Sequence, residues 1–508
     1  MTASRSRAST VNPARRIATG AAFTCAIKAD DTVWCWGRND QGQLGSSAHS
    51  LLTESVLPVQ TTTFGSGAVS TPVAVVAGAE HACVLTSAGT VWCWGRNGWG
   101  QAGVNGSTQW DPVQVAVGGT VTQLAAGGAN TCAVLADNSV RCWGQNNFGQ
   151  LGIGAADLVA HYTPEIVAGI PASFTVSSID IGTGHVCASS TEGEAWCWGR
   201  FTYGRLGTTA ASNVPSATRT QTVNGIATDI SAGAEHTCAV VGAGLVCFGR
   251  NHFGQSGQPN STTEFSTPTA VTMSGTVSRV SAGDAFTCVM LNTGAVHCFG
   301  NNAAMQLGRG NAVSFDETPG SVQGLSAGAV AISAGASHAC AIEPDGDVRC
   351  WGLNDSGQLG DNSQINRSSA VVVPFFDALP ATTTTIATTT VVSTTTLATT
   401  TTLATSTSVN SPTASSTPKA ITSVTAVKTL KLGRNRSLTA AKIATAVSLK
   451  IPKRSQGTMR ISITRGTKYC KFVGSTVRGI RKGTCTVTVV LLPKKSKPTV
   501  KTLKIQVQ

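Results

Sequence analysis

A pair of cysteines nine or ten residues apart recurs seven times along the chain, and this repeat constrains the fold more than any other feature of the sequence. The first cysteines of successive pairs are 49 to 58 residues apart, and every second cysteine is followed by an aromatic residue and a glycine. The pairs are Cys25 and Cys35, Cys83 and Cys93, Cys132 and Cys142, Cys187 and Cys197, Cys238 and Cys247, Cys288 and Cys298, and Cys340 and Cys350. A period of this length indicates stacked copies of one structural unit.

Within each pair, short apolar runs flank a turn, as in Cys25 to Ile27 before the turn and Val33 to Trp36 after it. This pattern predicts a β-hairpin with the two cysteines on facing strands. Facing residues have Cα atoms about 4.5 to 5.5 Å apart, which overlaps the disulfide range of about 4.4 to 6.8 Å. We therefore predict one disulfide per repeat, with buried reduced thiols as the alternative. Cys470 and Cys485 are predicted to form an eighth disulfide on parity alone.

Other cysteine chemistry fits the spacing poorly. Two thiolates per hairpin fall short of the four ligands of a structural zinc site, and the Cys-x-x-Cys spacing of redox catalysts is absent from the seven pairs. No metal or other cofactor is expected.

The strands are apolar on both alternating faces, which requires packed neighbours above and below. A closed ring of seven four-stranded units, a β-propeller, meets this requirement. The fold class predicted from the residues is therefore all-β.

Three segments, 77–103, 232–257 and 334–360, carry Ala-Gly, His, a turn and a Gly-Gln-Leu-Gly-like loop in the same order. In this they resemble the repeat of the regulator of chromosome condensation family, and the resemblance extends over about residues 12–376. It implies a seven-bladed propeller. The family includes nuclear exchange factors, and an exported bacterial inhibitor of β-lactamases looks like the same architecture, so the fold does not fix the function. We expect the exported bacterial type.

Ring closure is predicted from strands of Thr-Pro-Val type that follow the Gly-Gln-Leu-Gly-like loops. The chain begins without such a strand and ends with an extra one, in residues 368–376, which we expect to complete the first blade and so remove exposed sheet edges. The longest insertion, residues 46–70, is either a binding loop or a disordered excursion.

The chain changes character after the repeats. Residues 381–418 are almost entirely Thr, Ala, Ser and Val, which predicts a stalk or a plain flexible linker. Residues 419–508 hold 21 Lys and Arg and no acidic residue, whereas residues 1–418 hold 16 basic and 24 acidic residues. Alternating runs at 458–464, 484–492 and 500–507 predict a small β-sandwich that resembles immunoglobulin-like modules. The expected boundaries are a tail over 1–16, the propeller over 17–376, the linker over 377–419 and the basic module over 420–508.

The compartment and the partners of the basic module follow from charge and cysteine content. Sixteen cysteines favour an oxidising compartment, extracellular or in the cell envelope. The polar, basic N-terminus shows no signal peptide, and no window is long and apolar enough for a transmembrane helix. We expect the basic module to bind an anionic envelope polymer in a salt-dependent way. Nucleic acid is not expected, because Tyr469 and Phe472 are its only aromatic residues.

The sequence predicts a protein that is not an enzyme. Histidines occupy one repeat position in four copies, but Phe23, Asn130 and Phe286 occupy it in the others, so we interpret the histidines as structural hydrogen-bonding groups. They are His81, His185, His236 and His338. Signature motifs of hydrolases, nucleotide-binding loops and calcium loops are absent, and paired carboxylates on matching loops, as in glycosidases, are not apparent.

One set of residues is the candidate partner-binding site. Four consecutive repeats have an aromatic residue before the loop glycine, and three of those repeats have Arg after the aromatic-Gly pair. The aromatic–arginine arc comprises Trp99, Phe148, Tyr203, Phe253, Arg96, Arg200 and Arg250. Such residues are enriched in binding hot spots, and packing between blades is the alternative.

These features predict a monomeric propeller that binds a protein or glycan partner through its rim, in a non-catalytic recognition or adhesion protein at the cell surface. The alternative function is an intracellular regulator, such as a guanine-nucleotide exchange factor for a small GTPase.

Overall fold

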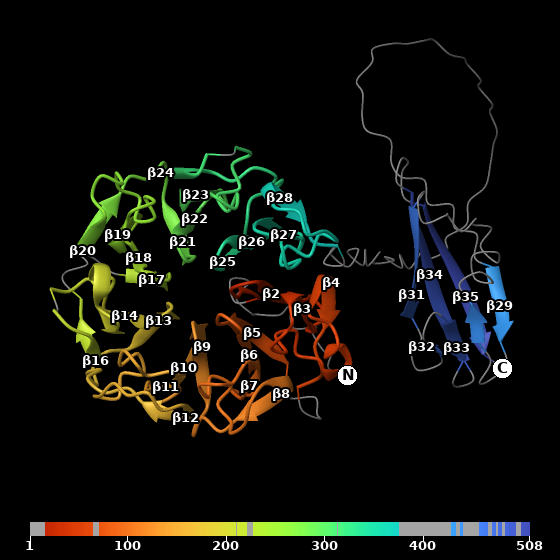
Figure 1. Ribbon diagram of the computed structural model, residues 1–508, viewed down its shortest axis with the longest axis horizontal. Helices are drawn as coiled ribbons and strands as arrows, with labels where there is room; N and C mark the ends of the chain where they lie inside the picture. Colours follow the sequence, from red (N-terminus) through yellow and green to blue (C-terminus); the bar gives the residue numbers. More distant parts are fainter. Residues whose placement is uncertain are drawn as a thin grey trace, which may run out of the picture. The chain divides into compact units, whose positions relative to one another are not determined.

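The computed structural model describes residues 16–374, apart from 65–70, 210, 221–226 and 312, together with the backbone of seven strands between residues 428 and 507. The chain forms two compact units, Met1–Thr388 and Thr389–Gln508. In the first unit, seven four-stranded antiparallel sheets are arranged in a ring (Figure 1). The predicted seven-bladed β-propeller is confirmed. The predicted linker, 377–419, and the tail up to residue 15 lie outside the described residues.

Each blade is a meander of four consecutive strands, with the first strand innermost. Blade 1 has β1 (Ile17–Thr19), β2 (Phe23–Ile27), β3 (Val33–Arg38) and β4 (Glu54–Gln60). Blade 2 has β5 (Pro72–Ala77), β6 (His81–Thr86), β7 (Val91–Gly95) and β8 (Gln109–Val115). Blade 3 has β9 (Val121–Gly127), β10 (Asn130–Leu135), β11 (Val140–Gly144) and β12 (His161–Ile166). Blade 4 has β13 (Val176–Ile181), β14 (His185–Ser190), β15 (Ala195–Gly199) and β16 (Val214–Arg219). Blade 5 has β17 (Ala227–Ala232), β18 (His236–Val241), β19 (Gly244–Arg250) and β20 (Glu264–Val271). Blade 6 has β21 (Val277–Ala282), β22 (Phe286–Leu291), β23 (Val296–Asn301) and β24 (Phe315–Ser321). Blade 7 has β25 (Ala331–Ala334), β26 (His338–Ile342), β27 (Val348–Gly352) and β28 (Arg367–Val372).

The ring closes without exchange of a strand between its first and last blades. β28 pairs with β27 in blade 7, and blade 1 is completed by β4, which pairs with β3. The prediction that residues 368–376 complete the first blade is therefore wrong. The Thr-Pro-Val segment at residue 71 forms the inner strand of blade 2, and the outer strand of blade 1 lies inside the stretch 46–70, which the sequence alone suggests to be an insertion. The described part of that stretch, up to residue 64, contains a 3-10 turn η2 (Ser47–His49) before β4.

The cysteines of each repeat face each other across the second and third strands of a blade. Their Cα atoms are 4.0–4.2 Å apart and their sulfur atoms lie at bonding distance. The pair Cys238 and Cys247 keeps this opposition despite its shorter hairpin, which turns through Gly242 at a φ of 58°. All fourteen cysteines are buried in the core between the blades.

The glycine after the aromatic residue is required by the backbone. Gly95 has a φ of 98°, and a Cβ placed on it would lie 2.6 Å from the carbonyl oxygen of Glu80 in the loop between the first and second strands. The register of the third and fourth strands shifts at this glycine, as in a bulge. The aromatic-Gly motif thus places a buried ring beside a close approach of two backbone segments.

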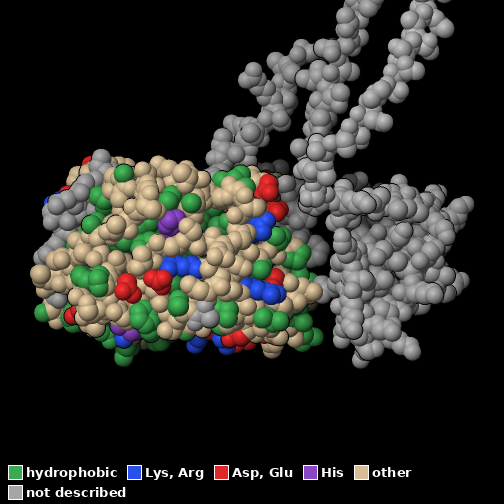
Figure 2. All heavy atoms as spheres, turned by 90° about the horizontal axis from the view of Figure 1, so that it is seen from above, with side chains coloured by type: hydrophobic (Ala, Val, Ile, Leu, Met, Phe, Trp, Pro, Cys, Tyr) green, Lys and Arg blue, Asp and Glu red, His purple; other side chains and the backbone are tan. Residues whose placement is uncertain are grey.

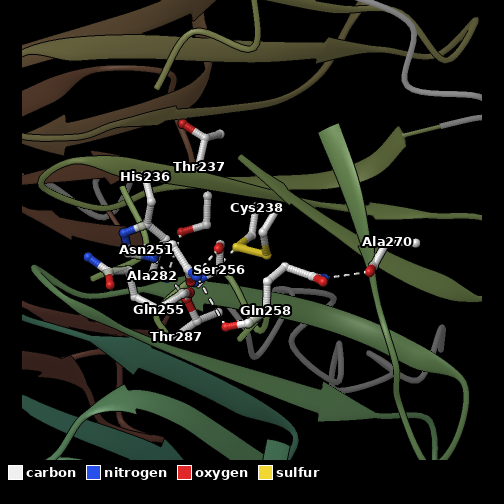
Figure 3. Close-up of a disulfide and its surroundings, with 12 residues drawn as sticks. His236, Thr237, Cys238, Asn251, Gln255, Ser256, Gln258, Ala270, Ala282 and Thr287 are labelled. Carbon is white, nitrogen blue, oxygen red and sulfur yellow. Dashed lines mark hydrogen bonds between the residues drawn. A yellow bond between two sulfur atoms is a disulfide. The ribbon is translucent and has the colours of Figure 1, made fainter. Parts of the chain in front are cut away.

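Neighbouring blades are joined through one backbone carbonyl in each strand 3–4 loop. At the boundary of blades 5 and 6, the carbonyl oxygen of Gln255 accepts a hydrogen bond of 2.8 Å from Thr287 Oγ1, which lies 2.8 Å from His236 Nε2 (Figure 3). The threonine hydroxyl donates its only proton to the carbonyl, so the histidine donates from Nε2. The neutral imidazole tautomer is therefore fixed by the blade boundary.

Every blade boundary satisfies this carbonyl with at least one donor from the next blade. Two of these carbonyl oxygens accept two hydrogen bonds each. That of Gln101 accepts from Trp143 Nε1 and Thr131 Oγ1, and that of Gln358 accepts from Trp36 Nε1 and Thr24 Oγ1. A single tryptophan donates to Gln43, Gln150 and Gln306, from Trp94, Trp198 and Trp351. A single threonine donates to Arg205 and Gln255, from Thr237 and Thr287. The ring is therefore held together by hydrogen bonds to one loop carbonyl at each blade boundary as well as by apolar packing.

The four repeat histidines are structural, as expected. Each is fully buried and bonds through Nε2 to a threonine of the next blade. Burial lowers the pKa of His81 and His236 to about 3 and that of His338 to about 4. Where the histidine is replaced by Phe23, Asn130 or Phe286, the threonine is replaced as well, by Ala82, Val186 or Ala339.

The innermost strands line a central channel of about 250 Å³. Around blades 4 to 7, one side chain per inner strand accepts the backbone N–H of the inner strand in the next blade. These bonds run from Ala232 to Asp180, from Ala282 to Ser231, from Ala334 to Ser281 and from Thr19 to Ser333. Blades 1 to 3 have Ala18, Val76 and Ala125 at the same register position. The channel wall therefore has a polar arc and an apolar arc.

In the second unit, the backbone forms a four-stranded and a three-stranded sheet. The first has the order β29 (Lys428–Leu432), β35 (Thr499–Val507), β34 (Gly483–Pro493) and β31 (Gly457–Arg465), and the second has β30 (Ser437–Thr439), β33 (Thr476–Gly479) and β32 (Cys470–Val473). The three runs predicted to be strands fall within β31, β34 and β35. The immunoglobulin-like sandwich and the disulfide between Cys470 and Cys485 stay predictions, because the side chains of these strands lie outside the described residues.

Candidate functional site

One face of the propeller carries the loops between strands 1 and 2 and between strands 3 and 4 of every blade, because antiparallel strands return their connections to the same end. We call this the loop face. In six blades the strand 3–4 loop is closed by an Asn and a Gln side chain. In blade 5, Asn251 Oδ1 accepts the N–H of Ser256, and Gln255 Oε1 accepts the N–H of Phe253. The same Gln bond fixes the backbone of Trp99 and Phe148 in blades 2 and 3.

The loop of blade 4 departs from this plan at both positions, with Phe201 in place of Asn and Arg205 in place of Gln. It forms the 3-10 turn η3 (Thr202–Gly204), in which Tyr203 has a φ of 65°. This conformation is unfavourable for a residue with a side chain. Tyr203 is also the most exposed aromatic residue of the arc, at 38%.

Arg205 stabilises the blade 4 loop through hydrogen bonds of its buried side chain. Its side chain is only 1% exposed, and it donates to the carbonyl oxygens of Thr202 and Ala234, each at 2.8 Å, and to the hydroxyl of Thr202 at 2.9 Å. Burial lowers the pKa of Arg205 to about 10, although the nearby Glu235 carboxylate opposes this shift. In blade 4, the charged guanidinium of Arg205 therefore occupies the position of the neutral glutamine side chain in the other six blades.

The structure brings two aromatic residues of the arc into contact with arginines of the following blade. The guanidinium of Arg200 lies 4.7 Å from the ring centre of Phe148, and that of Arg250 lies 4.7 Å from the ring centre of Tyr203. The guanidinium of Arg205 also lies near the ring of Tyr203, 5.6 Å from its centre. These distances are within the range of cation–π interactions. These aromatic–arginine contacts pack neighbouring blades against each other, and Tyr203 is exposed at the same time.

The other members of the arc are not joined in this way. Arg96 forms an ion pair of 2.6 Å with Glu80, and blade 1 offers no aromatic ring at Gln41 for it to cover. Trp99 and Phe253 are partly buried, and the ring of Phe253 lies 3.8 Å from that of the neighbouring His252. Of the seven residues of the predicted arc, the structure therefore brings four together, as the stacked pairs Phe148 with Arg200 and Tyr203 with Arg250.

Glu235 links the arginines of blades 4 and 5. Its carboxylate forms ion pairs with Arg250 and, at 3.5 Å, with Arg205. Burial acts to raise the pKa of Glu235, but the hydrogen bond from Arg250 and the charges of Arg250, Arg205 and Arg200 lower it overall. Arg205 and Glu235 were missed by the sequence reasoning, although an arginine at a position that is Gln in six repeats was a visible signal.

Two further groups of acidic residues are explained by local bonds. Asp180 in the channel wall accepts from Ser231 and Ala232, and burial raises its pKa to about 6. Glu343 lies beside Asp345 and Asp347, but its buried carboxylate is already bonded by Ser326, Ala327 and Arg349. Neither group requires a ligand to account for its burial. Within the described part of the chain, no helix has the length and apolar character to cross a membrane.

Comparison with known proteins agrees with the propeller fold. The profile of the RCC1-like domain matches residues 53–394, and that of the regulator of chromosome condensation (RCC1) repeat matches residues 14–43. The ultraviolet-B receptor UVR8 of Arabidopsis thaliana is 26% identical over 368 residues, which are 71% of this chain and 70% of the receptor. The probable E3 ubiquitin-protein ligase HERC4 of Homo sapiens is 29% identical over 233 residues, which are 44% of this chain but only 16% of the ligase.

Solved structures show the same fold. The crystal structure of human WBSCR16 superposes with a TM-score of 0.62 at 19% identity and covers 67% of this chain and 93% of that protein. Yeast RCC1 (Prp20), solved with Kap60, superposes with a TM-score of 0.62 at 18% identity and covers 73% and 89%. At these identities the likeness shows the fold alone.

Proposed function

The chain belongs to the RCC1-like domain family, and from this premise we propose that its propeller is a non-catalytic protein-binding platform that uses the loop face. The observation that carries the proposal is the pair of stacked contacts at blades 3 to 5, Arg200 on Phe148 and Arg250 on Tyr203. Aromatic and arginine side chains dominate the energetics of protein interfaces. Stacking restricts the arginines before a partner arrives, which lowers the entropy lost on binding.

Relatives support a protein rather than a glycan as the partner. UVR8 is named as an ultraviolet-B receptor, and yeast RCC1 (Prp20) was solved with the protein Kap60 bound to it. An exchange-factor activity stays the alternative, and no residue described above favours it specifically.

We also propose that the protein works in an oxidising compartment, outside the cell or in its envelope. Seven buried cysteine pairs at bonding distance support this, because such pairs are rare in reducing cytosol. The net charge of +21 over residues 419–508 supports attachment of the basic module to an anionic envelope polymer. Salt-dependent retention of the full chain on such a polymer would test the attachment.

The experiment that tests the protein-binding role is affinity capture with the full chain. Variants Phe148→Ala and Tyr203→Ala remove the stacked rings, and Ile166→Ala is the matched control because Ile166 is exposed on the outer strand β12. We expect a specific partner to be recovered by the wild-type chain and the control, with recovery about tenfold lower for each aromatic variant. Equal recovery by all variants would show that the loop face is not the binding surface.

A further inference from the structure

The junction of blades 4 and 5 on the loop face holds more positive charge than its own acidic residue neutralises. Arg200, Arg205 and Arg250 all act on the carboxylate of Glu235. Arg250 and Arg205 form ion pairs with it, whereas Arg200 has no acidic group within ion-pair distance in the described parts of the chain. We call these three residues the arginine cluster. Together with Glu235 it carries a net charge of about +2.

This charge is a local exception in an acidic part of the chain. Residues 1–418 hold 24 acidic and 16 basic residues. Other arginines at strand 3–4 loops have an acidic partner in their own blade. They form the pairs Arg38 with Asp40, Arg96 with Glu80, Arg309 with Asp316 and Arg367 with Asp361. On the side of the propeller that Figure 2 shows edge-on, basic groups likewise lie beside acidic ones.

The cluster is also held in place. Arg200 and Arg250 lie against aromatic rings, and a guanidinium stacked by its face keeps its in-plane N–H donors available to an acceptor. Tyr203, which supports Arg250, is itself fixed in a strained conformation by the bonds of Arg205 to the blade 4 loop. Arg205 is buried and acts as a positioning residue. The two more accessible arginines are thus presented at fixed positions with excess positive charge.

We propose that the arginine cluster binds an acidic segment of the partner protein, with an Asp or Glu carboxylate accepting hydrogen bonds from Arg200 and Arg250. Two planar guanidinium groups match the geometry of a carboxylate, and charge-assisted bonds of this kind are stronger than neutral ones. This inference rests on the proposed protein-binding function and specifies the chemistry of the ligand.

The test measures modification of individual arginines by phenylglyoxal in the full chain, read by mass spectrometry, with and without a hexaglutamate peptide. Arginines of the basic module also attract this peptide, so the readout must be taken residue by residue. We expect the rates at Arg200 and Arg250 to fall about tenfold when the peptide exceeds its dissociation constant about tenfold. Arg96, at the same repeat position but paired with Glu80, is the internal control and should keep its rate. A hexaserine peptide should protect none of the three.

A variant of the chain separates the effect of the charges from that of the stacked ring. Phe148→Leu removes the ring beneath Arg200 while leaving every ion pair of the cluster, and we expect it to reduce the protection of Arg200 at least about threefold, because the side chain is then no longer held. Equal protection of Arg96 and Arg200, or none at Arg200, would overturn the inference. If the peptide fails to protect while Tyr203→Ala still abolishes partner capture, the acidic ligand is wrong and the proposed function stands.

Discussion

His338 in the last blade lies 2.9 Å, from Nε2 to Oγ1, from Thr24 in the first blade, and Thr24 in turn donates to the carbonyl oxygen of Gln358. The boundary that closes the ring is therefore built like those within it, between blades 2 and 3, 4 and 5, and 5 and 6. A side-chain relay replaces the strand exchange that we predicted. This arrangement makes the stability of the ring depend on the protonation of buried histidines.

Acid should weaken the ring through these histidines. The pKa of His338 is lowered to about 4 in the folded chain, whereas an unfolded histidine titrates near 6.5. The unfolded state therefore binds more protons as the pH falls from about 6.5 to 4, and the free energy of unfolding drops by up to about 1.4 kcal/mol per pH unit for each such histidine. Urea midpoints measured from pH 7 to pH 4 would check this.

The control for the acid effect is the double variant His338→Phe with Thr24→Ala. It copies the boundary of Phe286 and Ala339 that the chain already uses, and Trp36 still donates to the carbonyl oxygen of Gln358. Its urea midpoint should depend less steeply on pH than that of the wild type. An unchanged slope would show that His338 does not contribute.

Two threonines at equivalent positions should differ in their importance. Thr237 makes the only hydrogen bond that the described residues offer to the carbonyl oxygen of Arg205, because Phe248 stands where five of the other six blades have tryptophan. Thr24 shares its carbonyl with Trp36. We expect Thr237→Val to lower the free energy of unfolding by about 1–3 kcal/mol more than Thr24→Val does, because an additional buried carbonyl is left unpaired. Urea denaturation of the two variants measures the difference, and equal costs would contradict the pairing scheme.

Glycines with similar backbone angles should respond differently to alanine. A Cβ at Gly95 would lie 2.6 Å from the Glu80 carbonyl oxygen, whereas one at Gly346, whose φ is 93°, meets nothing within 4 Å. Gly346→Ala should therefore cost only the conformational strain, about 1–2 kcal/mol. Gly95→Ala should lower the thermal midpoint further, because the backbone of two loops must also move. Similar midpoints would show that the close approach is not limiting.

The disulfides should contribute to stability one blade at a time. Replacing Cys132 and Cys142 by alanine together should reduce the free energy of unfolding by about 2–4 kcal/mol, as expected for a closed loop of this length. Non-reducing mass spectrometry of the native protein would first establish the seven pairs within repeats. Free thiols in that experiment would contradict the proposed oxidising compartment.

The period and the position of the cysteines were enough to predict the blades, because facing residues in a hairpin are fixed by local geometry. The assignment of the inner and outer strands to their blades was not predictable in the same way. β1 has only three residues, Ile17–Thr19, too few to show an alternating pattern; it pairs with β2 and donates one backbone hydrogen bond to Ser333 of blade 7. The Pro-Val pair of β4, at Pro58 and Val59, lies inside an apparent insertion, so the sequence did not reveal that blade 1 already has its own outer strand.

The site was predictable only as a list of residue types. The contact between Phe148 and Arg200 joins residues of different blades, and it depends on the blade-to-blade offset that a single repeat does not contain. The substitution of Arg205 for glutamine could have been found by comparing the repeats with one another, as could the joint loss of histidine and threonine at Phe286 and Ala339.

Because each blade is made entirely from consecutive strands, no sheet depends on where the chain starts. The connection between β4 and β5 could be opened, and the ends beyond β1 and β28 joined by a short linker, without separating any strand from its partners. Circular permutants of this propeller should fold, and new termini could be moved around the wheel to carry fused domains at a chosen blade.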